Sequence, residues 1–268
     1  MISKNRLKVI RLLRDRKRRE ASGKFLVEGI RAVEEAAASD WVIESVLYLS
    51  GFRDEEKSAP PKADALLTSL LERGALLYEV SEAELSQISD VVTSQGIVAV
   101  VQQRRVTEEE ILHRKSAMPV LVACDAIREP GNVGAIIRAA DWFGAQGVVL
   151  GKGTVELFNP KVVRSTVGSL FHLPIVEKID LLQFLSKLRT EGYVIAAADQ
   201  RGEISLGESR FTGPVALVLG NEAWGVSSEI LSEADLRIAI PRFGRAESLN
   251  VTAAASVFLW HLAIQFRQ

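Results

Sequence analysis

Short apolar runs alternate with amphipathic segments along most of this chain of 268 residues. In the first third, FLVEG (25–29) and VIESVLYL (42–49) have the apolar, β-branched character of strands, whereas residues 30–38 have helical spacing. Four further elements are expected here: helices at 63–73 and near 82–88, and strands at 75–79 and 95–102. The pattern predicts a small α/β domain over residues 1–102.

A charged segment separates this domain from a second one. Residues 103–118 carry no strand pattern, and we interpret them as a linker, with a helix as the alternative. Beyond them, continuous apolar runs rich in β-branched residues occur at 120–125, 147–150, 193–198, 215–220 and 236–240. Such runs are typical of buried parallel strands, and helical patterns between most of them indicate βαβ units. The fold class predicted for residues 119–268 is therefore α/β with a parallel sheet.

Charge is distributed unevenly, although the net charge is only −1. Residues 1–24 hold ten Lys or Arg and two acidic residues, which leaves 23 basic and 32 acidic residues for the rest of the chain. A basic arm of this kind favours contact with a polyanion such as nucleic acid. The alternative is a solvated helix face, because Leu7, Ile10 and Leu13 recur at helical spacing between the charges.

The cysteine and histidine contents argue against disulfide and metal chemistry. Cys124 is the single cysteine and lies in an apolar run, so we expect a buried core residue. The three histidines stand far apart, at 113, 172 and 261, and His172 is expected to pack beside its apolar neighbours. No apolar run reaches the ~18–20 residues that span a bilayer, and no apolar segment follows the basic arm as in a secretory signal. These features predict a cytoplasmic protein that binds neither metal nor membrane.

Three stretches that follow predicted strands are candidates for chemistry: EPGNVGAIIRAA (129–140), LGNEAWGV (219–226) and IPRFGRAESLNVTAAA (240–255). Open α/β sheets bind ligands in the crevice beyond the carboxyl ends of their strands. The two common nucleotide-binding patterns do not occur, since Gly151-Lys152-Gly153 lacks the third glycine of the dinucleotide motif and no P-loop motif is found. The three turn asparagines have a structural alternative as turn and cap residues: Asn132, Asn221 and Asn250.

In order and spacing, the three stretches resemble motifs 1, 2 and 3 of the SpoU, or TrmH-type, branch of the SPOUT RNA methyltransferases. The matching pieces are PGNVGAIIRAA, LGNEAWGV and IP…ESLNVTAAA, and the resemblance covers residues 119–268. More weakly, KFLVEGIRAVEEA and TSQGIVAVV resemble the small α/β RNA-substrate-binding domain that often precedes the catalytic domain. The resemblance implies a homodimer and a SPOUT domain with a deep trefoil knot, which general topology rules alone would reject.

The reaction that the resemblance implies is methyl transfer from S-adenosylmethionine to a ribose 2′-hydroxyl of rRNA or, as second choice, tRNA. A non-catalytic RNA-binding or ribosome-assembly factor with the same fold is the alternative, and no departure within the motifs indicates it. The resemblance places the cofactor against the turns of motifs 2 and 3, largely on backbone groups, at Leu219, Gly220, Asn221, Ile240 and Leu249. For Ile240 and Leu249, core packing is the alternative.

The resemblance also makes Arg138 the central catalytic residue, with a surface arginine as the alternative. A guanidinium keeps its proton in proteins, so we expect it to orient the 2′-oxygen and its phosphate through charged hydrogen bonds. Asn132 is expected to place Arg138 or the nucleotide, and Glu222 to pair with Arg138 or accept from the ribose. Ser248 and Asn250 are expected both to cap the last helix and to line the site.

The expected phosphate partners are Arg164 and the basic arm, with Arg11, Arg14, Arg18 and Arg19 as its candidates. Contacts to phosphates give salt-sensitive affinity and do not choose a sequence. Trp224, in motif 2, is interpreted as a packing residue, with stacking on a base as the alternative.

Overall fold

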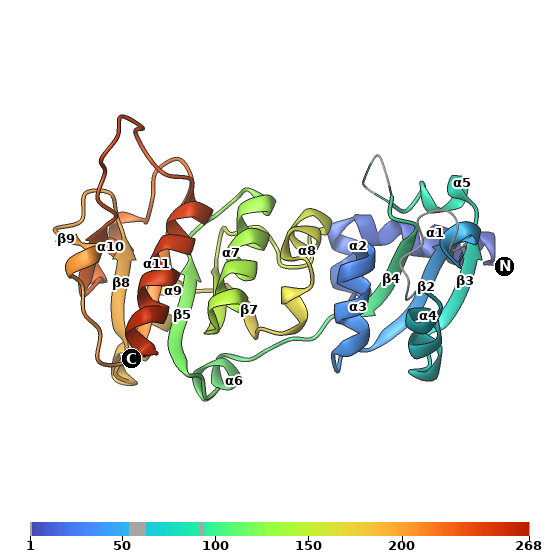
Figure 1. Cartoon of the computed structure of the whole chain (residues 1–268), viewed down its shortest axis with the longest axis horizontal. Coiled ribbons are helices and arrows are strands. Elements are labelled where there is room, and N and C mark those ends of the chain that lie inside the picture. Colours follow the sequence, from blue (N-terminus) through green and yellow to red (C-terminus); the bar gives the residue numbers. More distant parts are fainter. Residues whose placement is uncertain (1, 54–62, 90, 92–93, 268) are drawn as a thin grey trace. The chain divides into compact units, whose positions relative to one another are not determined.

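The computed structural model describes residues 2–53, 63–89, 91 and 94–267, which form two compact units (Figure 1). The first unit comprises Met1–Arg104 and Phe158–Phe171, and the second comprises Arg105–Leu157 and His172–Gln268. The units therefore interleave along the chain. The division into residues 1–102, 103–118 and 119–268 stays a prediction about domain organisation.

The first unit is built on a mixed sheet of four strands in the order β1–β4–β2–β3. The strands are β1 (Lys24–Glu28), β2 (Ile43–Leu49), β3 (Leu76–Val80) and β4 (Ile97–Gln102). Strands β1 and β2 run antiparallel to β4, whereas β3 runs parallel to β2. The helices of this unit are α1 (Lys4–Arg11), α2 (Arg16–Ser22), α3 (Ile30–Ala38), α4 (Ala63–Glu72), α5 (Glu82–Leu85) and α8 (Pro160–Thr166). The strands and helices predicted here are confirmed, with small differences at their ends.

The basic arm folds as two short helices with one apolar side. Leu7, Ile10 and Leu13 are buried in the core of the first unit, so the helical spacing predicted for them is confirmed. The charged side chains between them point outward, and Arg11, Arg14 and Arg18 are exposed. The arm therefore contributes to the core and still presents a basic surface.

Arg19 differs from the other arginines of the arm, because its side chain is 2% exposed. Its guanidinium donates to the carbonyl oxygens of Leu13 at 2.8 Å and Arg14 at 2.6 Å. A buried guanidinium must be satisfied by such acceptors. The structure thus gives Arg19 a role in joining the arm's two helices, where sequence reasoning had placed an RNA contact.

The second unit contains a sheet of seven strands that all run parallel, in the order β7–β6–β5–β10–β8–β11–β9. The strands are β5 (Met118–Cys124), β6 (Ala145–Gly151), β7 (Ile175–Ile179), β8 (Val194–Ala198), β9 (Ile204–Ser205), β10 (Val215–Leu219) and β11 (Leu236–Ala239). The predicted α/β fold with a parallel sheet is confirmed. Strands β7 and β9 were not predicted, because they are edge strands and lack a continuous apolar run.

Helices cover both faces of this sheet. On one face, α7 (Pro130–Phe143) and α11 (Val251–Phe266) lie side by side (Figure 1). On the other, α6 (Glu108–Leu112), α9 (Leu181–Thr190) and α10 (Ser228–Glu233) pack on alternate strand residues. The charged segment 103–118 thus contains a helix, α6, whose first turn is closed by a capping box between Thr107 and Glu110.

Within the described ranges, no helix is long and apolar enough to cross a membrane. The same residues contain no group of three or more His, Cys, Asp and Glu side chains that is arranged to hold a metal ion.

Candidate active site

The site lies where the carboxyl ends of β5 and β10 meet in the second unit. These two strands are parallel neighbours, so the loops that follow them start side by side. The Asp125 carboxylate accepts from the Ser227 N–H at 2.8 Å, and the Asn221 amide donates to the Ala126 carbonyl at 2.7 Å. The two loops that carry motifs 1 and 2 are therefore tied together directly beyond the sheet.

Motif 2 continues as a tight loop from Asn221 to Gly225. Two backbone hydrogen bonds of 2.9 Å close it, and the Asn221 side chain, 6% exposed, accepts from the Ala223 N–H at 2.9 Å. Gly220 lies directly against the far end of this loop, because a Cβ at Gly220 would come within 2.0 Å of Gly225 and Val226 backbone atoms. The structure gives Asn221 and Gly220 clear roles in shaping the turn.

Glu222, in this loop, holds the beginning of motif 1. Its carboxylate accepts from the backbone N–H groups of Arg128 at 3.3 Å and Glu129 at 3.1 Å, and from the Asn132 side-chain amide at 2.9 Å. Sequence reasoning expected Glu222 to pair with Arg138 or the ribose. In the structure its carboxylate instead fixes the turn that opens α7.

Asn132 connects all three motifs. While its amide nitrogen donates to Glu222, its oxygen is 3.3 Å from both the Asn250 amide nitrogen and the Thr252 hydroxyl, which donate to it. Asn250 is also the N-cap of α11, since its side chain accepts from the Thr252 N–H at 2.8 Å. The structure thus brings together Asn132, Glu222 and Asn250, and gives Asn250 both a capping and a site position.

Arg138 lies in the third turn of α7, the helix that begins with motif 1. Its side chain is exposed, and among the residues that the structure describes none forms a hydrogen bond or ion pair with it. A guanidinium in this state has all five donors available to a ligand. The geometry is compatible with contact to ribose and phosphate.

The remaining predicted site residues lie on the segment between β11 and α11. All ten residues of 241–250 are exposed, including Ser248, and Leu249 is 54% exposed. Core packing is therefore the wrong explanation for Leu249, whereas Ile240 is half-buried. Ser248 takes no part in capping, because Asn250 occupies the N-cap position.

Cys124 ends β5 beneath the site and is completely buried. Burial raises the pKa of its thiol to about 12, with the Asp125 and Glu222 carboxylates adding to the effect. A thiol with this pKa is protonated at neutral pH and is a poor nucleophile. The prediction of a structural core cysteine is confirmed.

Four residues around the site were not singled out as site residues from the sequence: Asp125, Ala126, Arg128 and Thr252. Thr252 comes two residues after a candidate cap, Asn250, and Asp125 ends an apolar run. These positions in the sequence could have identified both as candidate site residues. Trp224 was interpreted as a packing residue, and this is wrong because its side chain is 59% exposed. His172 is likewise exposed, and its Nδ1 is 3.1 Å from the Asp141 carboxylate.

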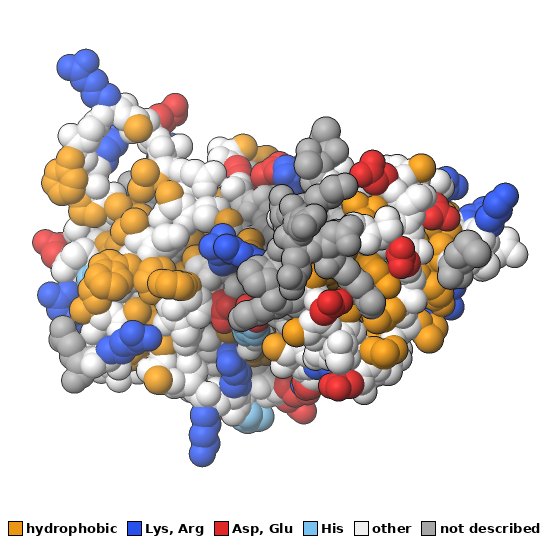
Figure 2. Space-filling model, turned by 45° about the vertical axis from the view of Figure 1, so that its right-hand side comes forward, with side chains coloured by type: hydrophobic (Ala, Val, Ile, Leu, Met, Phe, Trp, Pro, Cys, Tyr) orange, Lys and Arg blue, Asp and Glu red, His pale blue; other side chains and the backbone are white. Residues whose placement is uncertain are grey.

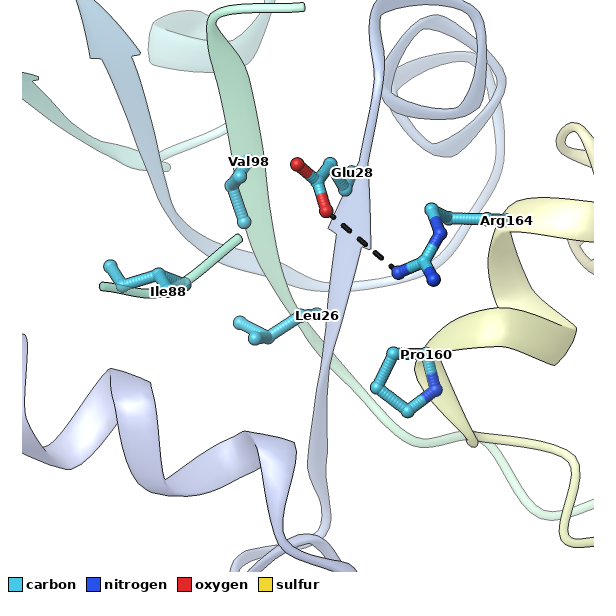
Figure 3. Close-up of a pocket in the computed structure, with 6 residues that line it drawn as sticks. All are labelled: Leu26, Glu28, Ile88, Val98, Pro160 and Arg164. Atoms are coloured by element: carbon cyan, nitrogen blue, oxygen red, sulfur yellow. Dashed lines mark ion pairs between the residues drawn. The ribbon is translucent and has the colours of Figure 1, made fainter. Parts of the chain in front are cut away.

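The first unit has a charged contact of its own at Arg164, on α8. Its guanidinium is 3.9 Å from the carboxylate of Glu28, whose side chain is 9% exposed (Figure 3). Ser89 and Ser94 also donate hydroxyl hydrogen bonds to this carboxylate. The cavity beside the pair has room for roughly one water molecule, so it is too small to hold a nucleotide. The side chain of Arg164 is 26% exposed and thus partly accessible from solvent.

The network around Glu222 is expected to weaken in acid. Burial raises the pKa of this carboxyl, but hydrogen bonds from Asn132 and from backbone N–H groups outweigh burial, so the pKa is lowered overall. Because the folded-state pKa is below the unfolded one, the stabilisation is complete above the ordinary glutamate value of ~4.3 and is lost as the pH falls through the lowered pKa. Urea unfolding from about pH 7 to about pH 3 should show a shrinking difference between the wild type and Glu222→Gln. A difference that stays constant over this range contradicts the expectation.

Fold and site together define a class: an α/β protein with a fully parallel sheet, whose site is built where three separated loops meet at the strands' carboxyl ends. The chain belongs to the SpoU rRNA methylase family, whose family model matches residues 119–260. Residues 4–99 match a second family model, described as an MRM3-like substrate binding domain. The resemblance inferred from the motifs is confirmed.

Relatives with known names extend over nearly the whole chain. The 23S rRNA (guanosine(2553)-2′-O)-methyltransferase RlmP of Bacillus subtilis is 36% identical over 93% of this chain and 92% of that protein. A 23S rRNA (uridine(2479)-2′-O)-methyltransferase of Streptomyces viridochromogenes is 32% identical over 95% and 87%. Among solved structures, the AdoMet-bound rRNA methyltransferase from Sinorhizobium meliloti matches with a TM-score of 0.84 and 30% identity, covering 98% of this chain and 96% of that one.

Proposed function

We propose that this chain is an RNA methyltransferase that moves the methyl group of S-adenosylmethionine to the 2′-hydroxyl of a ribose, with ribosomal RNA as the substrate class. The observation that carries the proposal is the meeting of the three motifs at Asn132, on the helix that also carries the exposed Arg138. Two relatives named as 23S rRNA 2′-O-methyltransferases, and a structural neighbour that binds AdoMet, support it.

The residues present fit the cofactor. Ile240 and Leu249 flank a segment of exposed chain, so aliphatic side chains and open backbone groups occur together, as nucleoside binding requires. The turn at Leu219, Gly220 and Asn221 is proposed to bind the cofactor from the side opposite to this segment. When bound, the cofactor's sulfonium supplies an electrophilic methyl group.

Arg138 positions the acceptor. Its donors bind the 2′-oxygen and an adjoining phosphate, and this fixes the oxygen in line for transfer. Asn132 and Glu222 hold the first turn of α7, and so determine where Arg138 points. Asn250 joins this support to the last helix, and Ser248 remains a proposed contact on the exposed segment.

RNA outside the reacting nucleotide is bound through phosphates. We assign this role to the exposed arginines of the arm, Arg11, Arg14 and Arg18, and to Arg164. Arg19 is not included, because its guanidinium is buried on backbone carbonyls. The reaction is placed in the cytoplasm, and the trefoil knot of the second unit is also part of the proposal.

Labelled methyl transfer tests the reaction. The protein is incubated with tritiated S-adenosylmethionine and bulk rRNA or tRNA from a strain that lacks the enzyme, and the RNA is digested to nucleosides. Label on a 2′-O-methylated nucleoside of rRNA is expected, whereas label on a base overturns the ribose assignment. If neither free RNA nor ribosomal subunits become labelled although the cofactor binds, the non-catalytic alternative is correct.

The protein is further proposed to act as a homodimer through α11. One side of this helix is buried on the sheet, yet Val257, Trp260 and Ile264 on another side are 40%, 58% and 39% exposed. Trp260 also lies against Phe143 of α7, with ring centroids 6.2 Å apart. Figure 2 shows hydrophobic side chains reaching the surface in the second unit. A helix that is apolar on all sides is normally covered, and a second copy covers it in most soluble oligomers.

Trp260→Glu is expected to convert the dimer into a monomer, because a buried unpaired carboxylate in a symmetric interface is strongly unfavourable twice over. Sedimentation velocity at micromolar concentration measures the change. Leu182→Glu is the matched control, since Leu182 is 42% exposed on α9 and lies on the opposite face of the sheet. A wild-type protein that sediments as a monomer contradicts the proposed dimer.

A further inference from the structure

A second recognition element stands beside the candidate active site, at Arg128 and Trp224. The guanidinium carbon of Arg128 lies over the indole ring of Trp224, 5.2 Å from its centroid. Trp224 is nevertheless 59% exposed. Most of the surface of Trp224 thus stays open to solvent although a guanidinium lies over the ring.

Hydrogen bonds fix the backbone of both loops that carry the pair. Trp224 lies in the closed loop between Asn221 and Gly225, which has a backbone hydrogen bond in each direction. The N–H of Arg128 donates to Glu222, two residues before Trp224. The loops that carry Arg128 and Trp224 are thus joined through the Glu222 carboxylate, which also holds Asn132.

Arg128 keeps its charge available. Its side chain is exposed, and within the part of the chain that the structure describes it has no hydrogen-bond or ion-pair partner. An arginine that only packed against the indole would gain little at such an exposed position. An aromatic face next to an arginine with open donors is the combination that binds a nucleotide, because the ring stacks on the base and the guanidinium binds the phosphate.

We propose that Arg128 and Trp224 form a nucleotide clamp, in which the indole stacks on a base of the RNA near the methylated ribose and the guanidinium binds a neighbouring phosphate. The inference rests on the proposed function for the identity of the RNA, and it deepens that function by naming two residues that hold the nucleotide. Stacking tolerates every base, since each has a π-face. This agrees with relatives that are named for a guanosine and for a uridine.

Indole fluorescence tests the clamp without requiring turnover. The full-length protein is titrated with a short uridine oligonucleotide and with an abasic oligonucleotide of the same length. The expected result is quenching by the uridine oligonucleotide alone, and loss of most of that quenching in Trp224→Phe, which retains an aromatic ring but not the indole. Equal quenching by the abasic oligonucleotide, or unchanged quenching in Trp224→Phe, overturns the clamp.

Kinetics with bulk rRNA separate stacking from simple apolar packing. Trp224→Leu is expected to raise KM for RNA about 10-fold to 100-fold, and Trp224→Phe to stay within about threefold of the wild type. Arg128→Gln should lower RNA affinity and reduce the slope of log affinity against log salt by about one, whereas Arg128→Lys should keep the slope. Thermal unfolding of each variant controls for folding. A Trp224→Leu variant with wild-type KM overturns the clamp.

The experiments distinguish failure of the clamp from failure of the proposed function. If the wild type methylates ribose but Trp224→Leu has the wild-type KM for RNA, the clamp is wrong and the proposed function stands. If the wild type methylates no RNA but the uridine oligonucleotide quenches Trp224, the proposed function is wrong and the clamp stands as an RNA-binding element.

Discussion

Arg138→Ala is expected to lower kcat for methyl transfer by about a thousandfold and to leave the affinity for S-adenosylmethionine within about twofold. The guanidinium is exposed and has no hydrogen-bond or ion-pair partner among the described residues, so its removal breaks no such bond within the protein. What it removes is the charged group that orients the 2′-oxygen, and misplacement of a reacting group costs about two to four powers of ten in rate. A thousandfold loss corresponds to about 4 kcal/mol of transition-state stabilisation.

Isothermal titration calorimetry with the cofactor, and single-turnover transfer to rRNA, measure the two parts of this expectation. Arg138→Lys should recover only a small part of the rate, because an ammonium cannot form the paired hydrogen bonds of a guanidinium. Lys115→Ala is a matched control, since it removes an exposed positive charge just before β5, at the opposite end of that strand from the site. If Arg138→Ala loses cofactor binding as well as transfer, the residue is structural.

Gly220→Ala is expected to abolish cofactor binding and to destabilise the second unit by several kcal/mol, although it adds a single methyl group. That methyl would lie 2.0 Å from backbone atoms of both Gly225 and Val226, and backbone cannot move aside as a flexible side chain can. Relief requires opening the Asn221–Gly225 loop, and this separates Glu222 from motif 1.

Gly225→Ala provides the control, because it makes the same chemical change at the other end of the loop. Gly225 has a φ of +75° and no atom within 4 Å of a Cβ, so only the backbone strain of about 1–2 kcal/mol is expected. Urea unfolding and cofactor calorimetry on both variants make the comparison. If the two variants have similar unfolding free energies and similar cofactor affinities, the close backbone approach at Gly220 is not required for the site.

The second unit was largely predictable because its central strands are buried on both faces. Strands β5, β6, β8, β10 and β11 appear as continuous apolar runs, and a parallel sheet brings their carboxyl ends to one edge. The sequence pattern alone therefore predicts that motifs 1, 2 and 3 lie at the same edge of the sheet. Edge strand β7 carries Glu177 and Lys178, so its sequence shows no such run.

Two features of the first unit could not be predicted from the hydrophobic pattern, because they depend on tertiary contacts. Arg19 stands in a row of similar charges, and only the fold reveals that its guanidinium is buried on carbonyls of the preceding turn. The segment from Phe158 to Phe171 belongs to the first unit. There, Phe158 packs on Phe25, with ring centroids 4.7 Å apart. Neither fact has a local signal, because each depends on residues distant in sequence or on packing of a whole unit.

The partners of Glu222 illustrate the same point within the site. Sequence reasoning placed this carboxylate in the correct loop and near the correct motif. In the structure the Glu222 carboxylate accepts hydrogen bonds from two backbone N–H groups and from the side-chain amide of Asn132. Every residue except proline carries a backbone N–H, so such donors have no signature in a sequence.

The hydrogen bond between Asn132 and Asn250 spans 118 positions of the chain and includes the cap of its last helix. During synthesis, therefore, the first unit's sheet and much of the parallel sheet can form while the nascent chain still lacks any complete site. Contacts of such long sequence separation form late in folding, because the intervening chain must be ordered first. A polypeptide interrupted before α11 would carry motifs 1 and 2 and still be unable to assemble the third side of the site, so the site can be completed only after α11 has been synthesised.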